Sequence, residues 1–158
     1  MAAIVLISCK IETVSAIGLD ISEKALLIAK RNAEVHNVLE RLKLRNSNVF
    51  SELNGERFDL IVSNPPYIPA IDISVLQPEV RDFEPLHALT DGGNGFSIIE
   101  HLVNEAPKFL KPNGWLLIEI GIHQAERVKK MFEKNIWKNV DILPDLQGIP
   151  RLVKAKLF

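Results

Sequence analysis

The chain has 158 residues, of which 47% are hydrophobic and 25% charged, and its formal net charge is −1. This length suits one globular domain with one core, and the near-zero charge gives the whole chain no attraction to nucleic acid. No apolar run reaches the roughly 18 residues that a membrane-spanning helix needs, and the start lacks the charged region of a signal peptide. The single cysteine, Cys9, excludes an internal disulfide. It fits a reducing compartment, so we expect the cytoplasm or an organellar matrix.

The first part of the chain alternates strand and helix patterns. Ala16–Asp20 is a short apolar run that predicts a buried strand ending in a carboxylate. Ser22 is a candidate helix N-cap, and apolar residues at helical spacing predict a helix over residues 23–36. Residues 42–45 alternate as in a strand, and the unbroken apolar centre of Phe58–Ser63 predicts a strand buried on both faces.

The second part begins with residues 69–94, whose prolines, glycines and acidic residues predict a long functional loop. A helix, a turn, a strand, a helix and two strands are expected after it, at residues 96–109, 111–114, 115–120, 123–134, 140–143 and 152–157. The pattern predicts an α/β fold with a mainly parallel sheet and a C-terminal antiparallel hairpin. Ligands of such sheets bind beyond the carboxyl ends of the strands, where Asp20 and Asn64 lie.

The sharpest chemical signal is Asn64-Pro65-Pro66-Tyr67, directly after an apolar strand. Prolines lack an N–H group and push the preceding residue into extended geometry, so this segment is stiff and poor in donors. The side-chain carbonyl of Asn64 and the backbone carbonyl of Pro65 are therefore a rigid pair of acceptors suited to a planar –NH₂ group. Tyr67 adds an aromatic face. A plain proline turn is the alternative, but the strand before the motif and the tyrosine after it favour function.

The segment from Phe58 to Pro69 resembles the substrate-binding motif of class I methyltransferases that modify amide or exocyclic amine nitrogens. The similarity continues through five further segments, at residues 78–81, 84–85, 88–89, 91–95 and 117–121. This longer pattern resembles the release-factor glutamine methyltransferases, the HemK/PrmC family. The resemblance implies a Rossmann-like fold, S-adenosylmethionine as cofactor, and the glutamine of a Gly-Gly-Gln loop in a peptide-chain release factor as acceptor.

The resemblance also implies roles for the motif residues. Asn64 and Pro65 are the expected catalytic residues, whose oxygens accept the two amide hydrogens of the acceptor. Pro66 and Tyr67 complete the substrate-binding set. Asn64 is expected to contact the cofactor as well.

Three further positions carry expected cofactor contacts. Asp20 matches the family's ribose-binding acid, and a helix-capping or surface role is its alternative. Ile21 is expected to pack on the adenine. Asn48 and Val49 stand where the family has Asp-Leu, so Asn48 is either an uncharged acceptor for the adenine amino group or a turn residue.

Several acidic residues and histidines receive no catalytic or metal-binding role. Glu79 and Glu84 lie in the long loop, and Glu119 lies either near the pocket or beside a buried partner. The four histidines have no metal-ligand spacing, so no metal site is expected.

The family's catalytic domain normally begins with a strand and a glycine-rich turn, which would precede Met1. Residues 2–10 instead resemble the helix that follows that turn, although residues 4–7 alone also suit a strand. We therefore expect residues 1–158 to be a single catalytic domain that lacks its central strand, its glycine-rich motif and the family's N-terminal helical domain. Such a truncated chain is expected to bind cofactor weakly and to be marginally stable.

The sequence thus predicts a monomeric enzyme that transfers a methyl group from S-adenosylmethionine to a glutamine of a release factor, without contact to a membrane. One alternative is a nucleic-acid methyltransferase that acts on an exocyclic base amine. The low net charge and the loop over residues 78–95 disfavour it. The other alternative is not an enzyme: it is an inactive remnant, or a binding module that keeps the fold but not the cofactor site.

Overall fold

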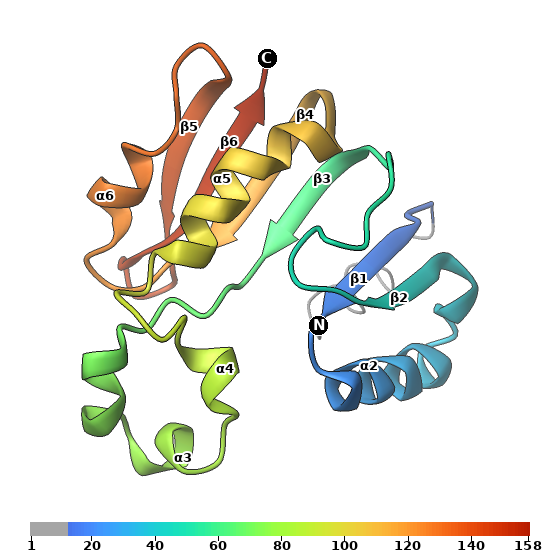
Figure 1. The fold of residues 1–158 in the computed structure, drawn as a ribbon. Helices are drawn as coiled ribbons and strands as arrows, with labels where there is room; N and C mark the ends of the chain where they lie inside the picture. Colours follow the sequence, from blue (N-terminus) through green and yellow to red (C-terminus); the bar gives the residue numbers. More distant parts are fainter. Residues whose placement is uncertain (1–12) are drawn as a thin grey trace. The chain divides into compact units, whose positions relative to one another are not determined.

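The structure is a computed structural model that describes residues 13–158 and falls into two compact units, Met1–Asn54 and Gly55–Phe158. The helix or strand expected within residues 2–10 lies outside the described residues. Each unit has its own sheet, one with strands β1 and β2 and one in the order β3-β4-β6-β5 (Figure 1). Within residues 13–158 the two sheets are separate, and no strand pairs with both β1 and β3.

In the first unit, β1 (Ala16–Asp20) pairs in parallel with β2 (Leu42–Asn46). Helix α2 (Glu23–Val35) connects them and begins at Ser22, whose Oγ accepts a hydrogen bond from the N–H of Ala25 at 3.2 Å. These predicted elements are confirmed. A short 3₁₀ helix, η1 (Leu39–Arg41), was not predicted. The small core consists of Ala33, Val38 and Leu42, with Ala16 and Leu44 packed against them.

In the second unit, β3 (Phe58–Ser63) pairs in parallel with β4 (Leu110–Glu119). The arrowheads of both strands in Figure 1 point toward the lobe that carries α3 (Pro78–Arg81) and α4 (Leu86–Leu89). The last two strands, β5 (Trp137–Pro144) and β6 (Pro150–Leu157), form an antiparallel hairpin, and β6 also pairs antiparallel with β4. Parallel strands with helical connections and a C-terminal hairpin confirm the predicted α/β fold class.

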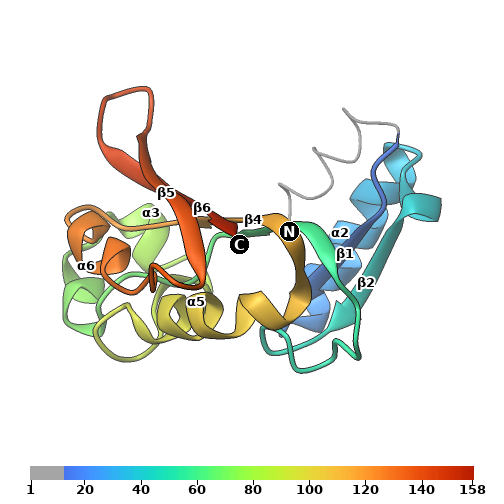
Figure 2. The same ribbon diagram turned by 90° about the horizontal axis from the view of Figure 1, so that it is seen from above.

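Two helices pack on this sheet. Helix α5 (Ser97–Phe109) contacts β4, and α6 (Ala125–Lys129) contacts β5 and β6. Figure 2 shows α5 on one side of the sheet. As predicted, Pro107 lies near the end of α5, in its last turn. Among the helices within residues 13–158, none is long and apolar enough to cross a membrane.

The segment between β3 and α5, expected to be an irregular loop, contains three short helices. They are η2 (Ala70–Val75), α3 (Pro78–Arg81) and α4 (Leu86–Leu89). Each helix follows a proline or begins with one, and proline favours the first turn of a helix by fixing φ. Helices of four to six residues are too short to show a periodic apolar pattern in the sequence.

Only one face of the larger sheet is fully buried. Its side chains from β4 and β6 are completely inaccessible: Leu116, Ile118, Val153 and Ala155. Because side chains alternate along a strand, Ile61 lies on this face, whereas Leu60 lies on the opposite one. Leu60 is 44% exposed. The prediction that Phe58–Ser63 is buried on both faces is therefore wrong.

Two other boundaries differ from the predictions. The helix expected over residues 123–134 is only α6, because His123 has a left-handed φ of 66° and cannot start a helix. The turn expected at residues 111–114 lies inside β4 as a bulge, between Leu110 and Trp115. Pro112 there has no N–H for the ladder.

We predict that the two faces of the larger sheet respond differently to truncation. Leu116→Ala removes a fully buried side chain and should lower the free energy of unfolding by about 2–5 kcal/mol. Leu60→Ala, on the half-open face, should cost less than about 1 kcal/mol. Urea unfolding followed by tryptophan fluorescence measures both. Equal losses would contradict the assignment of the core face.

Candidate active site

The motif Asn64-Pro65-Pro66-Tyr67 leaves the sheet at the carboxyl end of β3. The parallel register places Ser63 beside Ile118 of β4, so Glu119 lies at the same edge as the motif. This is the edge at which open α/β sheets bind ligands. The topology therefore brings together two chain segments that are more than fifty residues apart.

The two expected acceptors differ in exposure. Asn64 is exposed, and within residues 13–158 its side-chain amide has no hydrogen-bond partner. Pro65 is buried, which fixes the backbone between the strand and the tyrosine. Neither Pro65 nor Pro66 has an N–H group that would compete for the oxygens. The polar atoms of Asn64 are thus available to a ligand, on a stiff backbone.

Tyr67 is held by a carboxylate. Its hydroxyl donates a hydrogen bond to Oε1 of Glu119 at 2.9 Å. Partial burial, together with this hydrogen bond and the negative charge of Glu119, raises the pKa of Tyr67 from 10.0 to about 12. The phenol therefore stays protonated at neutral pH and its ring is fixed at the sheet edge. Glu119 thus lies at the strand end beside the motif, and its partner Tyr67 is half-buried, not buried.

The chain after the motif is fastened at several points. The N–H of Ile68 donates to the oxygen of Leu89 and that of Ala70 to the oxygen of Gly93, both at 2.9 Å. Asp91 accepts hydrogen bonds from the hydroxyl and N–H of Ser97 and from two glycine N–H groups. Partial burial raises the pKa of Asp91, but these bonds outweigh it and lower the pKa to about 2. Asp91 is therefore a structural anion that orders the glycine turn before α5.

One residue at this site escaped the sequence analysis. Gln124, 5% exposed at the start of α6, hydrogen-bonds to the backbone oxygen of Tyr67 at 2.9 Å. A lone glutamine at the start of a helix carries no pattern that indicates such a contact. Glu79 and Glu84 are exposed, and the structure gives neither a catalytic contact.

Four of the five expected cofactor residues, Asp20, Ile21, Asn48 and Val49, lie in the first unit, at or after the carboxyl ends of β1 and β2, and the fifth, Asn64, lies in the second unit. Asp20 Oδ1 accepts the N–H of Ser22 at 2.8 Å, so the carboxylate orders the turn into α2. The Ile21 side chain is 52% exposed, and its backbone oxygen accepts from Asn46 Nδ2 at 2.9 Å. Both alternatives for Asp20, a turn former and a ligand group, are compatible with this geometry.

The turn after β2 holds Asn48 and Val49. The Asn48 side chain is exposed, and its backbone N–H donates to the Ser51 hydroxyl at 3.2 Å. Val49 has a φ of 51°, a left-handed conformation that a β-branched residue rarely adopts. The buried Ser47 hydroxyl donates to the Val49 oxygen at 3.0 Å and fixes this conformation. Strain of this kind is concentrated at functional turns.

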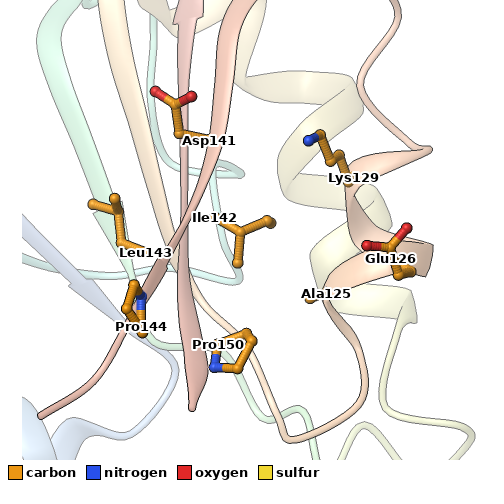
Figure 3. A pocket seen from close by; sticks show the side chains of 8 residues that line it. All are labelled: Ala125, Glu126, Lys129, Asp141, Ile142, Leu143, Pro144 and Pro150. Atoms are coloured by element: carbon orange, nitrogen blue, oxygen red, sulfur yellow. The ribbon is translucent and has the colours of Figure 1, made fainter. Parts of the chain in front are cut away.

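A groove of about 640 Å³ lies elsewhere, between α6 and the β5–β6 hairpin (Figure 3). Its charged lining residues are Glu126, Lys129 and Asp141, and Asp141 pairs with Lys154 at 3.3 Å. The rest of the lining is aliphatic or proline, and none of it belongs to the motif. Across the described part of the chain, no three His, Cys, Asp or Glu side chains gather as a metal site. The chemistry therefore points to the motif and not to the groove.

Solved structures of similar shape define the class. The chain superposes on a methyltransferase from Pyrococcus furiosus with a TM-score of 0.71 at 19% identity, covering 99% of this chain and 69% of that one. It matches an RNA methyltransferase from Salinibacter ruber with a TM-score of 0.59 at 13% identity, covering 99% and 73%. At such identities the likeness shows the fold alone, which is that of the class I methyltransferases.

The sequence comparisons are more specific. A family model described as a methyltransferase domain matches residues 2–147, so the chain belongs to the methyltransferase domain family. It is 43% identical over 141 residues to a release factor glutamine methyltransferase of Geobacter sulfurreducens, covering 89% of this chain and 49% of that protein. It is 45% identical over 137 residues to the enzyme of that name from Pasteurella multocida, covering 86% and 45%. The chain spans about half the length of these relatives.

We predict that Glu119→Gln lowers the pKa of Tyr67 from about 12 without restoring 10.0, because burial, the larger cause, remains. Tyr67 is the only tyrosine, so the absorbance of its tyrosinate form reports this residue alone. A raised folded-state pKa means that the stabilisation is fully present below the unfolded value near 10 and is lost as the pH rises toward 12. An unchanged titration in the variant would contradict the Tyr67–Glu119 bond.

Proposed function

We propose that this chain is the catalytic part of an S-adenosylmethionine-dependent enzyme that methylates the side-chain amide nitrogen of a glutamine. The acceptor is the glutamine of a Gly-Gly-Gln loop in a peptide-chain release factor. The observation that carries the proposal is the stiff acceptor site at Asn64 and Pro65, where the Asn64 amide has no hydrogen-bond partner within residues 13–158, in a chain 43% identical to a release factor glutamine methyltransferase.

The motif suits a weak nucleophile. An amide nitrogen reacts poorly because its lone pair is delocalised into the carbonyl. The side-chain oxygen of Asn64 and the backbone oxygen of Pro65 would accept its two hydrogens, which orients the nitrogen and stabilises the positive charge that develops on it. Pro66 and Tyr67 confine the planar amide. The transfer would form a bond from the methyl carbon to the amide nitrogen and break its bond to the sulfonium sulfur, which would keep the electron pair. One amide proton would then leave to solvent, so no base has to act beforehand.

The residues at the ends of β1 and β2 fit a nucleoside. The Asp20 carboxylate keeps lone pairs beyond the one that Ser22 uses, enough to accept two ribose hydroxyls. The exposed Ile21 side chain offers an apolar surface to adenine, and the Asn48 amide and the strained Val49 backbone lie in the neighbouring turn. S-Adenosylmethionine supplies, when bound, a methyl group activated by its sulfonium charge.

The lobe after the motif favours a protein acceptor. Its exposed large apolar side chains are Ile71, Val75, Phe83 and Leu86, and exposed apolar surface is available to a protein partner. Residues 70–90 contain four carboxylates and one Lys or Arg side chain. The carboxylates are Asp72, Glu79, Asp82 and Glu84, and the cation is Arg81. A surface with this excess of negative charge repels a phosphate backbone. The lobe therefore supports a release factor over a nucleic acid as the partner.

Release factors act in translation, so we place the enzyme in the cytoplasm or an organellar matrix, which also suits a chain with one cysteine. We propose that residues 1–158 act as one catalytic domain and as a monomer, with the release factor as the only macromolecular partner.

We predict that Asn64→Ala lowers methyl transfer to a release factor by roughly a hundredfold or more, the scale of one lost transition-state hydrogen bond. The assay counts label transferred from the cofactor, for the chain itself and for the chain extended before Ala2 by a relative's glycine-rich strand and turn. Asn104→Ala, on the exposed face of α5, is the matched control. Near-normal turnover in the Asn64 variant would refute the site. Preferential labelling of oligonucleotides would instead support a nucleic-acid methyltransferase that acts on an exocyclic base amine.

We predict that Asp20→Ala weakens S-adenosylmethionine binding by about 1–3 kcal/mol, the scale of charge-assisted hydrogen bonds. Calorimetry measures the affinity, and Asp59→Ala removes an equal charge from an exposed strand position as control. Asp20→Asn keeps an acceptor for Ser22 and separates loss of the turn from loss of the charge. Equal affinities for wild type and Asp20→Ala would show that Asp20 only shapes the turn.

A further inference from the structure

Gln124 joins three segments of the second unit through one buried side chain. Its Nε2 donates to the backbone oxygens of Tyr67, at 2.9 Å, and of Gly95, at 3.3 Å. Its Oε1 accepts the N–H of Gly121 at 2.8 Å. Both N–H groups and the oxygen of the amide are therefore satisfied by backbone atoms. A buried amide in such a network specifies one arrangement, because any other leaves polar groups unpaired.

The two glycines that Gln124 contacts allow the segments to approach closely. A Cβ on Gly95 would lie 2.2 Å from the Tyr67 oxygen, and Gly95 also has a φ of +77°. A Cβ on Gly121 would lie 3.1 Å from Cδ2 of Tyr67 and 3.1 Å from Oε1 of Gln124. Tyr67 is thus packed against bare backbone on two sides, with the Gln124 amide between them.

This network fixes the motif at its far end. At the near end, β3 holds Ser63 beside β4. At the far end, Gln124 holds the Tyr67 carbonyl and Glu119 holds the Tyr67 hydroxyl. Between these ends, Pro65 and Pro66 restrict the backbone torsions. Because this segment is stiff and is fixed at both ends, the oxygens of Asn64 and Pro65 can point in few directions.

We propose that Gln124 is a positioning residue: by holding the Tyr67 backbone, it orients the oxygens of Asn64 and Pro65 toward the acceptor nitrogen. The catalytic part of this inference rests on the proposed function, whereas the positioning of Tyr67 does not. Misplacing reacting groups by small distances lowers turnover more than it weakens binding. Gln124 would accordingly affect kcat and leave the affinity for the cofactor unchanged.

The test uses the full chain with ¹³C-labelled tyrosine, in which the single tyrosine gives one NMR signal, from Tyr67. Gln124→Met keeps the length of the side chain and removes its hydrogen bonds. Gln124→Glu keeps the acceptor for Gly121 and places an oxygen against the two carbonyls. Gln147→Met, in the exposed hairpin loop, is the matched control. Tryptophan fluorescence from Trp115 and Trp137 confirms that each variant is folded.

We expect both Gln124 variants to shift or broaden the Tyr67 signal and Gln124→Met to lower the pKa of Tyr67, while the control leaves both as in wild type. Turnover on a release factor should fall about tenfold or more, with the cofactor KM within about twofold of wild type. An unchanged Tyr67 signal in both folded variants would overturn the proposal, as would an altered signal with unchanged turnover. A wild-type protein that methylates no release factor contradicts the proposed function instead, and the Tyr67 signal still decides the positioning of Tyr67.

Discussion

The site depends on the parallel pairing of β3 with β4. A parallel ladder ends both strands at the same edge of the sheet, so the residues that follow them meet there. Asn64-Pro65-Pro66-Tyr67 follows β3, while Glu119, Gly121 and Gln124 lie at or beyond the end of β4. An antiparallel pairing would send the two groups to opposite edges. The Tyr67–Glu119 hydrogen bond and the Gln124 network exist only because of this topology.

The stiffness of the motif has both local and distant causes. The two prolines restrict the backbone and supply no donors, which is a local property of the sequence. The direction in which the stiff segment leaves the sheet is set by contacts with remote residues, Glu119 through its carboxylate and Gln124 through its amide. Catalysis by orientation needs both, because a rigid segment that points in the wrong direction cannot align the acceptor.

Sequence patterns predicted the regular elements well. Ala16–Asp20 and Phe58–Ser63 have the predicted bounds, and Ser22 caps its helix, because apolar runs and caps are local signals. The motif and its acceptor oxygens could also be named from sequence, although their roles stay predictions. The short helices after the motif and the late start of α6 could not be predicted, since they depend on turns and on a left-handed residue, His123. Gln124 was missed because its partners are backbone atoms, which have no sequence signature.

The central claim is that Asn64 and Pro65 hold a glutamine amide for methylation. The most direct measurement is a crystal structure of the chain with a Gly-Gly-Gln peptide and the demethylated cofactor. The account predicts the glutamine amide nitrogen within about 2.7–3.2 Å of both Oδ1 of Asn64 and the backbone oxygen of Pro65, the range of an N–H···O hydrogen bond. A peptide bound with its glutamine amide away from these two oxygens, for example on Glu119, would contradict it.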